Sequence, residues 1–103
     1  MTSGPKKQIP PFKLVPQPLN EEARKLHAFK WAPKEVGTRH KLGGKPDSLQ
    51  VEDTPKCPEC GETMTFYGQF DSINDDYCIA DCGMIFVYYC FDCISAKAIV
   101  QSD

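Results

Sequence analysis

Two pairs of cysteines have the spacing of metal ligands. Cys57 and Cys60 are separated by two residues, and Cys90 and Cys93 repeat that spacing. A turn of this length can point two thiolates at one ion, and four thiolates suit the tetrahedral coordination of zinc. Gly61 follows the first pair and can take the positive φ angle that closes such a turn. The spacing therefore predicts one zinc ion held by these four cysteines.

Cys78 and Cys82 lie between the two pairs and have a looser spacing of three intervening residues. One interpretation makes them small buried apolar residues near the site, since free cysteine is often buried. A second makes them ligands of an iron–sulfur cluster, which would then replace zinc. A disulfide between them, or a redox role, is the third. The sequence alone leaves these alternatives open.

Other polar residues show no catalytic pattern. His27 and His40 are the two histidines of the chain, and both lie well upstream of the cysteines. We expect each to be exposed or hydrogen-bonded rather than a ligand. No Ser–His–Asp or Cys–His arrangement can be argued from spacing. The sequence therefore predicts a protein that is not an enzyme.

Charge is divided unevenly along the chain. Residues 1–56 contain 11 lysines and arginines and 6 acidic residues, whereas residues 57–103 contain one lysine and 8 acidic residues. The acidic half disfavours nucleic acid as a partner, because phosphate binding depends on Lys and Arg. An acidic stretch at 71–81 is either a solvated loop or a surface for a basic protein. We predict that a protein partner contacts this stretch at Asp71, Asp75, Asp76, Tyr77 and Asp81.

The N-terminus predicts a cytoplasmic protein. Residues 1–7 lead into a proline-rich run and contain no apolar stretch of the kind found in secretory signals. No window reaches the roughly 18 consecutive apolar residues of a membrane span. Thiols stay reduced in the cytoplasm, which favours metal binding over disulfides for clustered cysteines.

The first part of the chain is predicted to be mostly extended. Residues 1–18 carry five prolines, which exclude a continuous helix or a central strand. We expect an extended arm here, with a short edge strand at 12–15. Asn20 is expected to cap a short helix at 21–27, because its side chain can accept a backbone N–H of the first turn. A glycine-rich turn is expected at 41–46.

The second part is predicted to be β-structure. Apolar residues alternate at 62–70, form a continuous run at 84–89 and fit a short strand at 96–100. The predicted fold class is small α+β. It is a zinc-ribbon-like antiparallel β-meander stapled by metal, with an extended N-terminal arm and one short helix. We divide the chain into the arm, 1–18, and a single metal-binding domain, 19–103.

Several motifs together resemble a known family. They are His40-Lys41-Leu42-Gly43-Gly44-Lys45-Pro46, Leu49-Gln50, Cys57-Pro58-Glu59-Cys60-Gly61, Met64, Phe66, Gln69, Asp71 and Gly83-Met84-Ile85-Phe86-Val87. This set resembles the C-terminal metal-binding segment of bacterial YwqG-like proteins and, more distantly, programmed-cell-death-protein-2-like proteins. The resemblance covers residues 36–93. This chain is much shorter than members of that family, and Cys78 and Cys82 are additions to the pattern.

Two functions follow as hypotheses. Small stand-alone bacterial proteins of this kind resemble immunity proteins of polymorphic toxin systems. That resemblance implies a cytoplasmic, non-enzymatic protein that binds and neutralises a cognate bacterial toxin. The alternative is a nucleic-acid- or ribosome-associated zinc-ribbon protein that uses the basic residues of the first half. Those residues are scattered rather than clustered, which favours the first hypothesis.

Overall fold

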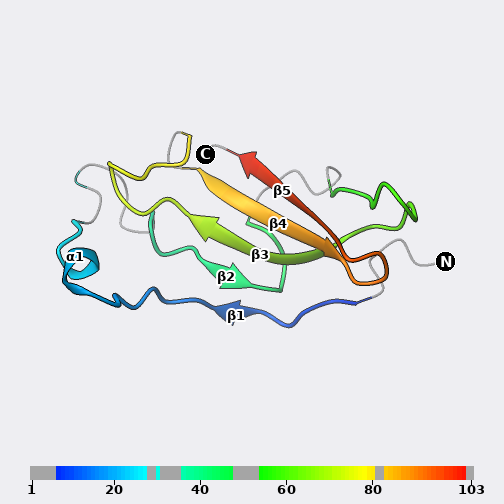
Figure 1. Cartoon of the computed structure of the whole chain (residues 1–103), viewed down its shortest axis with the longest axis horizontal. Coiled ribbons are helices and arrows are strands. Elements are labelled where there is room, and N and C mark those ends of the chain that lie inside the picture. The colour runs from blue at the N-terminus through cyan, green and yellow to red at the C-terminus, as the bar shows by residue number, and fades with distance from the viewer. Residues whose placement is uncertain (1–6, 28–29, 31–35, 48–53, 81–82, 102–103) are drawn as a thin grey trace.

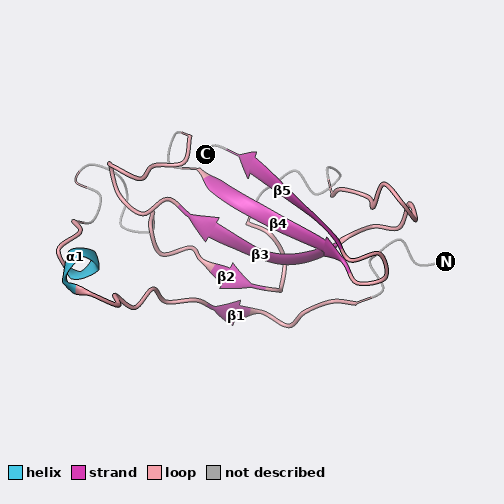
Figure 2. Ribbon diagram, in the orientation of Figure 1, coloured by secondary structure: helices cyan, strands magenta, loops and turns pink. Residues whose placement is uncertain are grey.

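The computed structural model describes residues 7–27, 30, 36–47, 54–80 and 83–101. Five β-strands and one short helix lie in these residues, and the strands form a single sheet (Figure 1). Figure 2 shows that loops join the strands and that the helix lies at one end of the sheet. Within this described part of the chain, no helix has the length and apolar character needed to cross a membrane.

The sheet is an antiparallel meander, as predicted, because each strand pairs with its neighbours in sequence. Across the sheet the strands are β1 (Phe12–Lys13), β2 (Lys41–Leu42), β3 (Thr65–Asp71), β4 (Met84–Cys90) and β5 (Ser95–Gln101). The strands β4 and β5 lie where the sequence predicted them. β3 begins later than predicted because Thr63 pairs with Lys56 in the turn before it.

The core lies on one face of the sheet, which we call the inner face. Met84, Phe86 and Tyr88 are buried there, since alternate positions of a strand point to the same side. The ring of Phe66 packs against those of Phe86 and Tyr88, with centroids 6.4 and 5.5 Å apart. Met64 and two cysteines belong to the same cluster. The core thus continues to the cysteine-bearing end of the sheet.

A β-bulge interrupts β3 at Tyr67. Phe66 pairs with Tyr88 and Gly68 pairs with Val87, so Tyr67 has no partner of its own on β4. A bulge changes the direction of the side chains that follow it. Tyr67 is 43% exposed and points away from the inner face. The bulge therefore adds an aromatic ring to the opposite face of the sheet.

The N-terminal arm is hydrogen-bonded into the sheet. Phe12 of β1 lies opposite Leu42 of β2, and the N–H of Leu14 donates to the carbonyl of His40 at 3.1 Å. The edge strand predicted at 12–15 is therefore present, although it is only two residues long. Figure 1 shows the arm running along the whole sheet below β2 and β3.

The glycine-rich turn predicted at 41–46 begins only at Gly43, because Lys41 and Leu42 form β2, and it brings the arm close to that strand. The N–H of Gly44 donates to the carbonyl of Ile9 at 2.7 Å. Gly43 has a φ of +66°, and a Cβ at this position would lie 2.4 Å from the carbonyl oxygen of Pro10. Only glycine permits both the left-handed backbone and this approach.

Helix α1 (Glu21–Arg24) is a single turn capped by Asn20. The side chain of Asn20 accepts the N–H of Ala23 at 2.8 Å, as the sequence predicted. The helix ends earlier than the predicted 21–27. It buries no residue and contacts no strand, so no packing extends it beyond what the cap supports.

Candidate metal centre

The two cysteine pairs meet at one end of the sheet. The first pair precedes β3, and the second begins at Cys90, the last residue of β4. Since β3 and β4 are antiparallel neighbours, the start of one lies beside the end of the other, with Thr65 opposite Tyr89. Figure 1 shows the loop before β3 and the turn between β4 and β5 together at the right-hand end of the view.

The ligand atoms of the pairs lie close enough for a single ion. The four-cysteine group consists of Cys57, Cys60, Cys90 and Cys93, whose Sγ atoms all lie within 4.8 Å of one another. The sulfurs of Cys60 and Cys90 are 3.8 Å apart. Tetrahedral zinc with Zn–S bonds of about 2.3 Å places its sulfurs about 3.8 Å apart. The predicted set of cysteines therefore comes together, and this group can hold a metal ion.

The two pairs form turns of the same kind. The N–H of Gly61 donates to the carbonyl of Cys57 at 2.8 Å, and the N–H of Ile94 donates to the carbonyl of Cys90 at 2.9 Å. The residue after each pair has a positive φ, +76° at Gly61 and +55° at Ile94. Each turn thus presents two thiols to the same point from one tight loop of backbone.

No sequence pattern predicted the conformation of Ile94. A β-branched residue rarely adopts the left-handed backbone conformation, whereas a glycine such as Gly61 adopts it freely. The Ile94 side chain is 79% exposed, so burial does not offset the strain. Such strain persists only where the surroundings impose it. Here the turn that aims Cys90 and Cys93 imposes the conformation of Ile94.

The four-cysteine group lies partly inside the core. Cys57 and Cys90 are buried with the apolar cluster of the inner face, whereas Cys60 is exposed and Cys93 is half-buried. All four ligand positions of a tetrahedron are supplied by the protein. A catalytic zinc site keeps one position open for water or substrate, and a structural site does not. Four cysteines are the ligand set that structural zinc centres use.

Hydrogen bonds shift the thiol pKa values of Cys57 and Cys93 in opposite directions. The pKa of the Cys57 thiol is lowered to about 7, because the backbone N–H groups of Cys60 and Glu59 donate to its sulfur. Hydrogen bonds with the sulfurs of Cys60 and Cys57, together with burial, raise the pKa of Cys93 to about 12. Metal ligands are thiolates, so Cys57 is the sulfur best prepared for binding near neutral pH.

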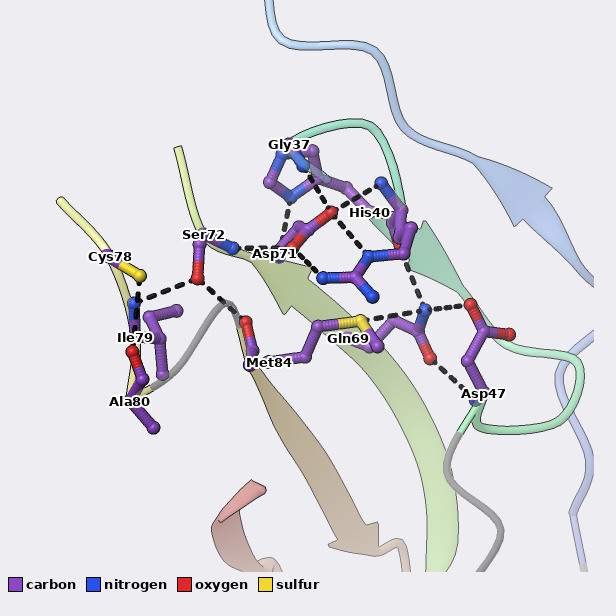
Figure 3. A network of polar contacts seen from close by, with 12 residues as sticks. Gly37, His40, Asp47, Gln69, Asp71, Ser72, Cys78, Ile79, Ala80 and Met84 are labelled. Carbon is purple, nitrogen blue, oxygen red and sulfur yellow. Dashed lines mark hydrogen bonds and ion pairs between the residues drawn. The ribbon is translucent and has the colours of Figure 1, made fainter. Parts of the chain in front are cut away.

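Cys78 lies at the other end of the sheet. It belongs to the loop between β3 and β4, and the seven residues of β3 span about 23 Å. Its side chain is exposed, and its sulfur donates to the carbonyl of Ala80 at 3.2 Å (Figure 3). The predictions that Cys78 is buried near the metal or is an additional ligand are therefore wrong. Cys82 lies outside the described residues.

Asp71 is buried at the end of β3, so the prediction that it contacts a partner is wrong. The guanidinium of Arg39 donates to both carboxylate oxygens at 2.8 Å, and the N–H groups of Gly37 and Arg39 donate to one of them at 2.7 and 2.9 Å. Burial alone raises the pKa of Asp71, but the Arg39 side chain and these N–H groups outweigh it and hold the pKa below its usual value. Figure 3 shows these bonds converging on the carboxylate.

The same polar network also contains Gln69, Asp47 and His40. The Gln69 amide nitrogen donates to the carbonyl of Arg39 at 2.7 Å and to Asp47 at 2.8 Å. His40 accepts the N–H of Asp71 at its Nδ1 at 3.0 Å, in agreement with the expectation of a hydrogen-bonded histidine. These bonds fasten the segment 37–47 to β3 (Figure 3). The sequence motifs contain Gln69 and His40, whereas no motif contains Asp47.

The loop after β3 is held by two buried polar residues. Asn74 accepts the N–H groups of Asp76 and Tyr77 at 3.0 Å and donates to the carbonyl of His27. Ser72 donates to the carbonyl of Gly83 and accepts the N–H of Ile79. As a result, the loop has a defined shape at its outer surface.

The sequence also predicted partner contacts at Asp75, Asp76, Tyr77 and Asp81. Asp75, Asp76 and Tyr77 are exposed on this loop. One carboxylate oxygen of Asp75 accepts the N–H of Lys30 at 3.4 Å. Asp81 lies outside the described residues.

Comparisons of the chain with protein-family models, with curated proteins and with solved structures find no match. The candidate site therefore rests on its own geometry, and the family resemblance stays a prediction from motifs. What the geometry establishes is a small antiparallel sheet with four cysteines gathered at one end, in a group that can hold a metal ion.

Proposed function

We propose that this chain is a zinc-ribbon-like protein whose metal is structural, and that it acts by binding another protein rather than by catalysis. The observation that carries this proposal is the closed four-cysteine group, with sulfurs that all lie within 4.8 Å of one another. A site of this kind joins segments of the chain and leaves no position for substrate.

In a chain of this size, a bound metal would supply a large share of the free energy of folding. The buried apolar cluster is small, and a core in a domain this short supplies only about 3–5 kcal/mol. Zinc binding to four cysteines contributes about 10–16 kcal/mol at neutral pH. A metal that joins the loop before β3 to the turn after β4 therefore accounts for most of the stability.

Zinc is favoured over an iron–sulfur cluster by the compactness of the group. Sulfurs 3.8 Å apart match the edge of a tetrahedron around one ion. A cluster of several irons bridged by sulfide spreads its thiolates farther apart. The exposed Cys78 at the far end of the sheet also removes one of the two additional ligands that would have favoured a cluster.

Elemental analysis tests the identity of the metal. Protein purified without added metal is expected to contain about one equivalent of zinc per chain and to be colourless. Iron with labile sulfide, or a brown preparation, would replace this assignment with a cluster. One equivalent of iron without sulfide would retain the structural site and change only the metal.

The proposed partner surface is the acidic loop after β3, defined by Asp75, Asp76 and Tyr77. Two observations support it. The loop is fixed from inside by Asn74 and Ser72, so little ordering cost accompanies binding. Its carboxylates and aromatic ring point outward, where charge accelerates association with a basic partner and the ring offers area to bury.

Reversal of one charge on this loop tests the partner surface. With a partner captured from the native host and identified, Asp76→Lys is expected to slow association about tenfold and to flatten its salt dependence. Glu62→Lys makes the same charge change at the opposite end of the sheet and serves as the matched control. Equal effects of the two variants would show that the loop is a solvated turn that does not contact the partner. Salt-sensitive binding of RNA through the basic half would contradict the protein-binding function.

The finer proposal is an immunity protein that neutralises a cognate bacterial toxin in the cytoplasm. The motif resemblance and the exposed acidic loop support it. A partner that is toxic when expressed alone and harmless when expressed with this chain is the expected result. A partner without toxicity would retain the binding function and exclude the immunity role.

A further inference from the structure

The N-terminal arm occupies a site on the sheet that fits an extended segment. The edge of β2 pairs with β1 of the arm. Next to that pair, the N–H of Gly44 donates to the carbonyl of Ile9 at 2.7 Å, and the missing side chain of Gly43 leaves the space that Ile9 and Pro10 fill. We call strand β2 together with Gly43 and Gly44 the arm-binding edge.

Contacts at both ends fix the arm beside this edge. At the metal end of the sheet, the hydroxyl of Thr65 donates to the carbonyl of Lys7 at 2.7 Å, and the Lys7 ammonium lies 4.8 Å from the ring centroid of Phe91. At the other end, the N–H of Leu14 donates to the carbonyl of His40 at 3.1 Å. The sheet therefore recognises the arm mainly through its backbone.

The arm contributes little to the core. None of residues 7–18 is buried, and only Ile9 and Leu14 among them are half-buried. No residue of this segment belongs to the apolar cluster of the inner face, and among the described elements β1 contacts only β2. Segments with few buried contacts open at a lower free energy than the core does. The arm is therefore expected to leave the sheet without unfolding it.

We propose that the arm is an exchangeable strand, and that the arm of a second copy of this chain takes its place on the arm-binding edge. A second copy carries the identical segment, so the exchange needs no new interface. The connection between β1 and β2 has 27 residues, at 14–40, and helix α1 within it packs against no strand. A connection of this length spans roughly 90 Å when fully extended, which is enough to reach another sheet.

The tether sets the balance between the two arms. A segment tethered to its own site has an effective concentration there of about 1 mM. The arm lies in place in the single chain, so its dissociation constant for the arm-binding edge lies below that concentration. At micromolar concentrations each chain binds its own arm, and the wild-type chain is expected to be monomeric. Exchange is therefore measured best with copies that have lost this internal contact.

Two full-length, metal-bound copies with complementary defects test the exchange. The first carries Ile9→Asp and Leu14→Pro, which charge a half-buried side chain and remove the N–H that binds His40, so its arm leaves an intact edge. The second carries Gly43→Ala, whose Cβ would lie 2.5 Å from the Ile9 carbonyl oxygen, so its edge rejects an intact arm. When the copies are mixed at about 1 mM each, the arm of the second is expected to bind the edge of the first.

The amide of Gly44 in the first copy, labelled with ¹⁵N, reports the binding by NMR. Its resonance is expected to return to the wild-type position, and its exchange with solvent is expected to slow at least about tenfold, when the second copy is added. A second copy that also carries the two arm substitutions is the negative control and should change neither. Val15→Asp is the matched charge control, since this side chain is 73% exposed, and it should leave the arm of the same chain in place.

Metal content and circular dichroism of each copy verify folding. If Gly43→Ala fails to fold, Gly44→Ala replaces it in the second copy, since its Cβ would lie 2.8 Å from Pro11 of the arm. An unchanged Gly44 resonance in the mixture overturns the proposal. Equal association with the negative control also overturns it, because another surface would then be responsible. So does a wild-type Gly44 amide that exchanges as slowly as those of β4, because the arm would then leave only on global unfolding.

Discussion

Replacing Cys57 with serine is expected to abolish metal binding and to unfold the long strands, while Cys78→Ser leaves both unchanged. Cys57 is buried within the core and its sulfur is one of the four that lie within 4.8 Å. Loss of one ligand removes most of the roughly 10–16 kcal/mol that zinc supplies, more than a core of this size can replace. Zinc content after gel filtration and the far-ultraviolet circular dichroism spectrum measure the two effects.

Cys93→Ser and Cys78→Ser provide the comparison. Cys93 belongs to the second pair, and its replacement is expected to have the same consequence as that of Cys57. Cys78 is exposed, so its serine variant should change the free energy of unfolding by no more than about 0.5 kcal/mol. Full zinc occupancy in Cys57→Ser, or metal loss in Cys78→Ser, would show that the four-cysteine group is not the metal site.

Asp71→Asn is expected to lower the free energy of unfolding by about 3–5 kcal/mol without removing a metal ligand. The Asp71 side chain is 0% exposed and that of Arg39 is 18% exposed, so the substitution removes the carboxylate from a poorly solvated ion pair. The asparagine amide would also place N–H donors toward the donors of Gly37 and Arg39. Urea unfolding of the metal-bound protein at neutral pH measures the loss.

The pH dependence of this effect has a definite sign. The pKa of Asp71 is lowered by folding, so its contribution to stability is complete above the ordinary carboxyl pKa of about 3.9. That contribution is lost as the pH falls through the lowered value, and the difference between wild type and Asp71→Asn should then shrink. Asp76→Asn, on the exposed loop, is the control and should stay within about 0.5 kcal/mol of wild type. A difference between wild type and Asp71→Asn that grows in acid would contradict the assigned role.

Features encoded over a few neighbouring residues could be predicted from the sequence. The two cysteine pairs are one-turn motifs, and the cap at Asn20 depends on a residue three positions away. The continuous apolar run at 84–89 predicted a strand, and β4 confirms it. The strained turn at Ile94 was not predictable in this way, because isoleucine gives no local signal for a positive φ.

Contacts between distant residues were decided only by the tertiary structure. Asp71 and Asp76 are both acids in one polar stretch, yet Asp71 meets Arg39 and is buried, whereas Asp76 is exposed. The register that sets Lys41 opposite Gln69 brings Arg39 to Asp71, and no sequence pattern fixes a register between strands so far apart in the chain.

The candidate metal centre likewise depends partly on local sequence and partly on the tertiary structure. Ligand type and the pairing of the cysteines follow from spacing, since a cysteine three positions beyond another shares its turn. Which cysteines meet depends instead on β3, a strand about 23 Å long that separates the loop bearing Cys78 from the four-cysteine group. The sequence therefore determined the chemistry of the site, and the antiparallel pairing of β3 with β4 determined its membership, because strands transmit position over distances that local patterns do not encode.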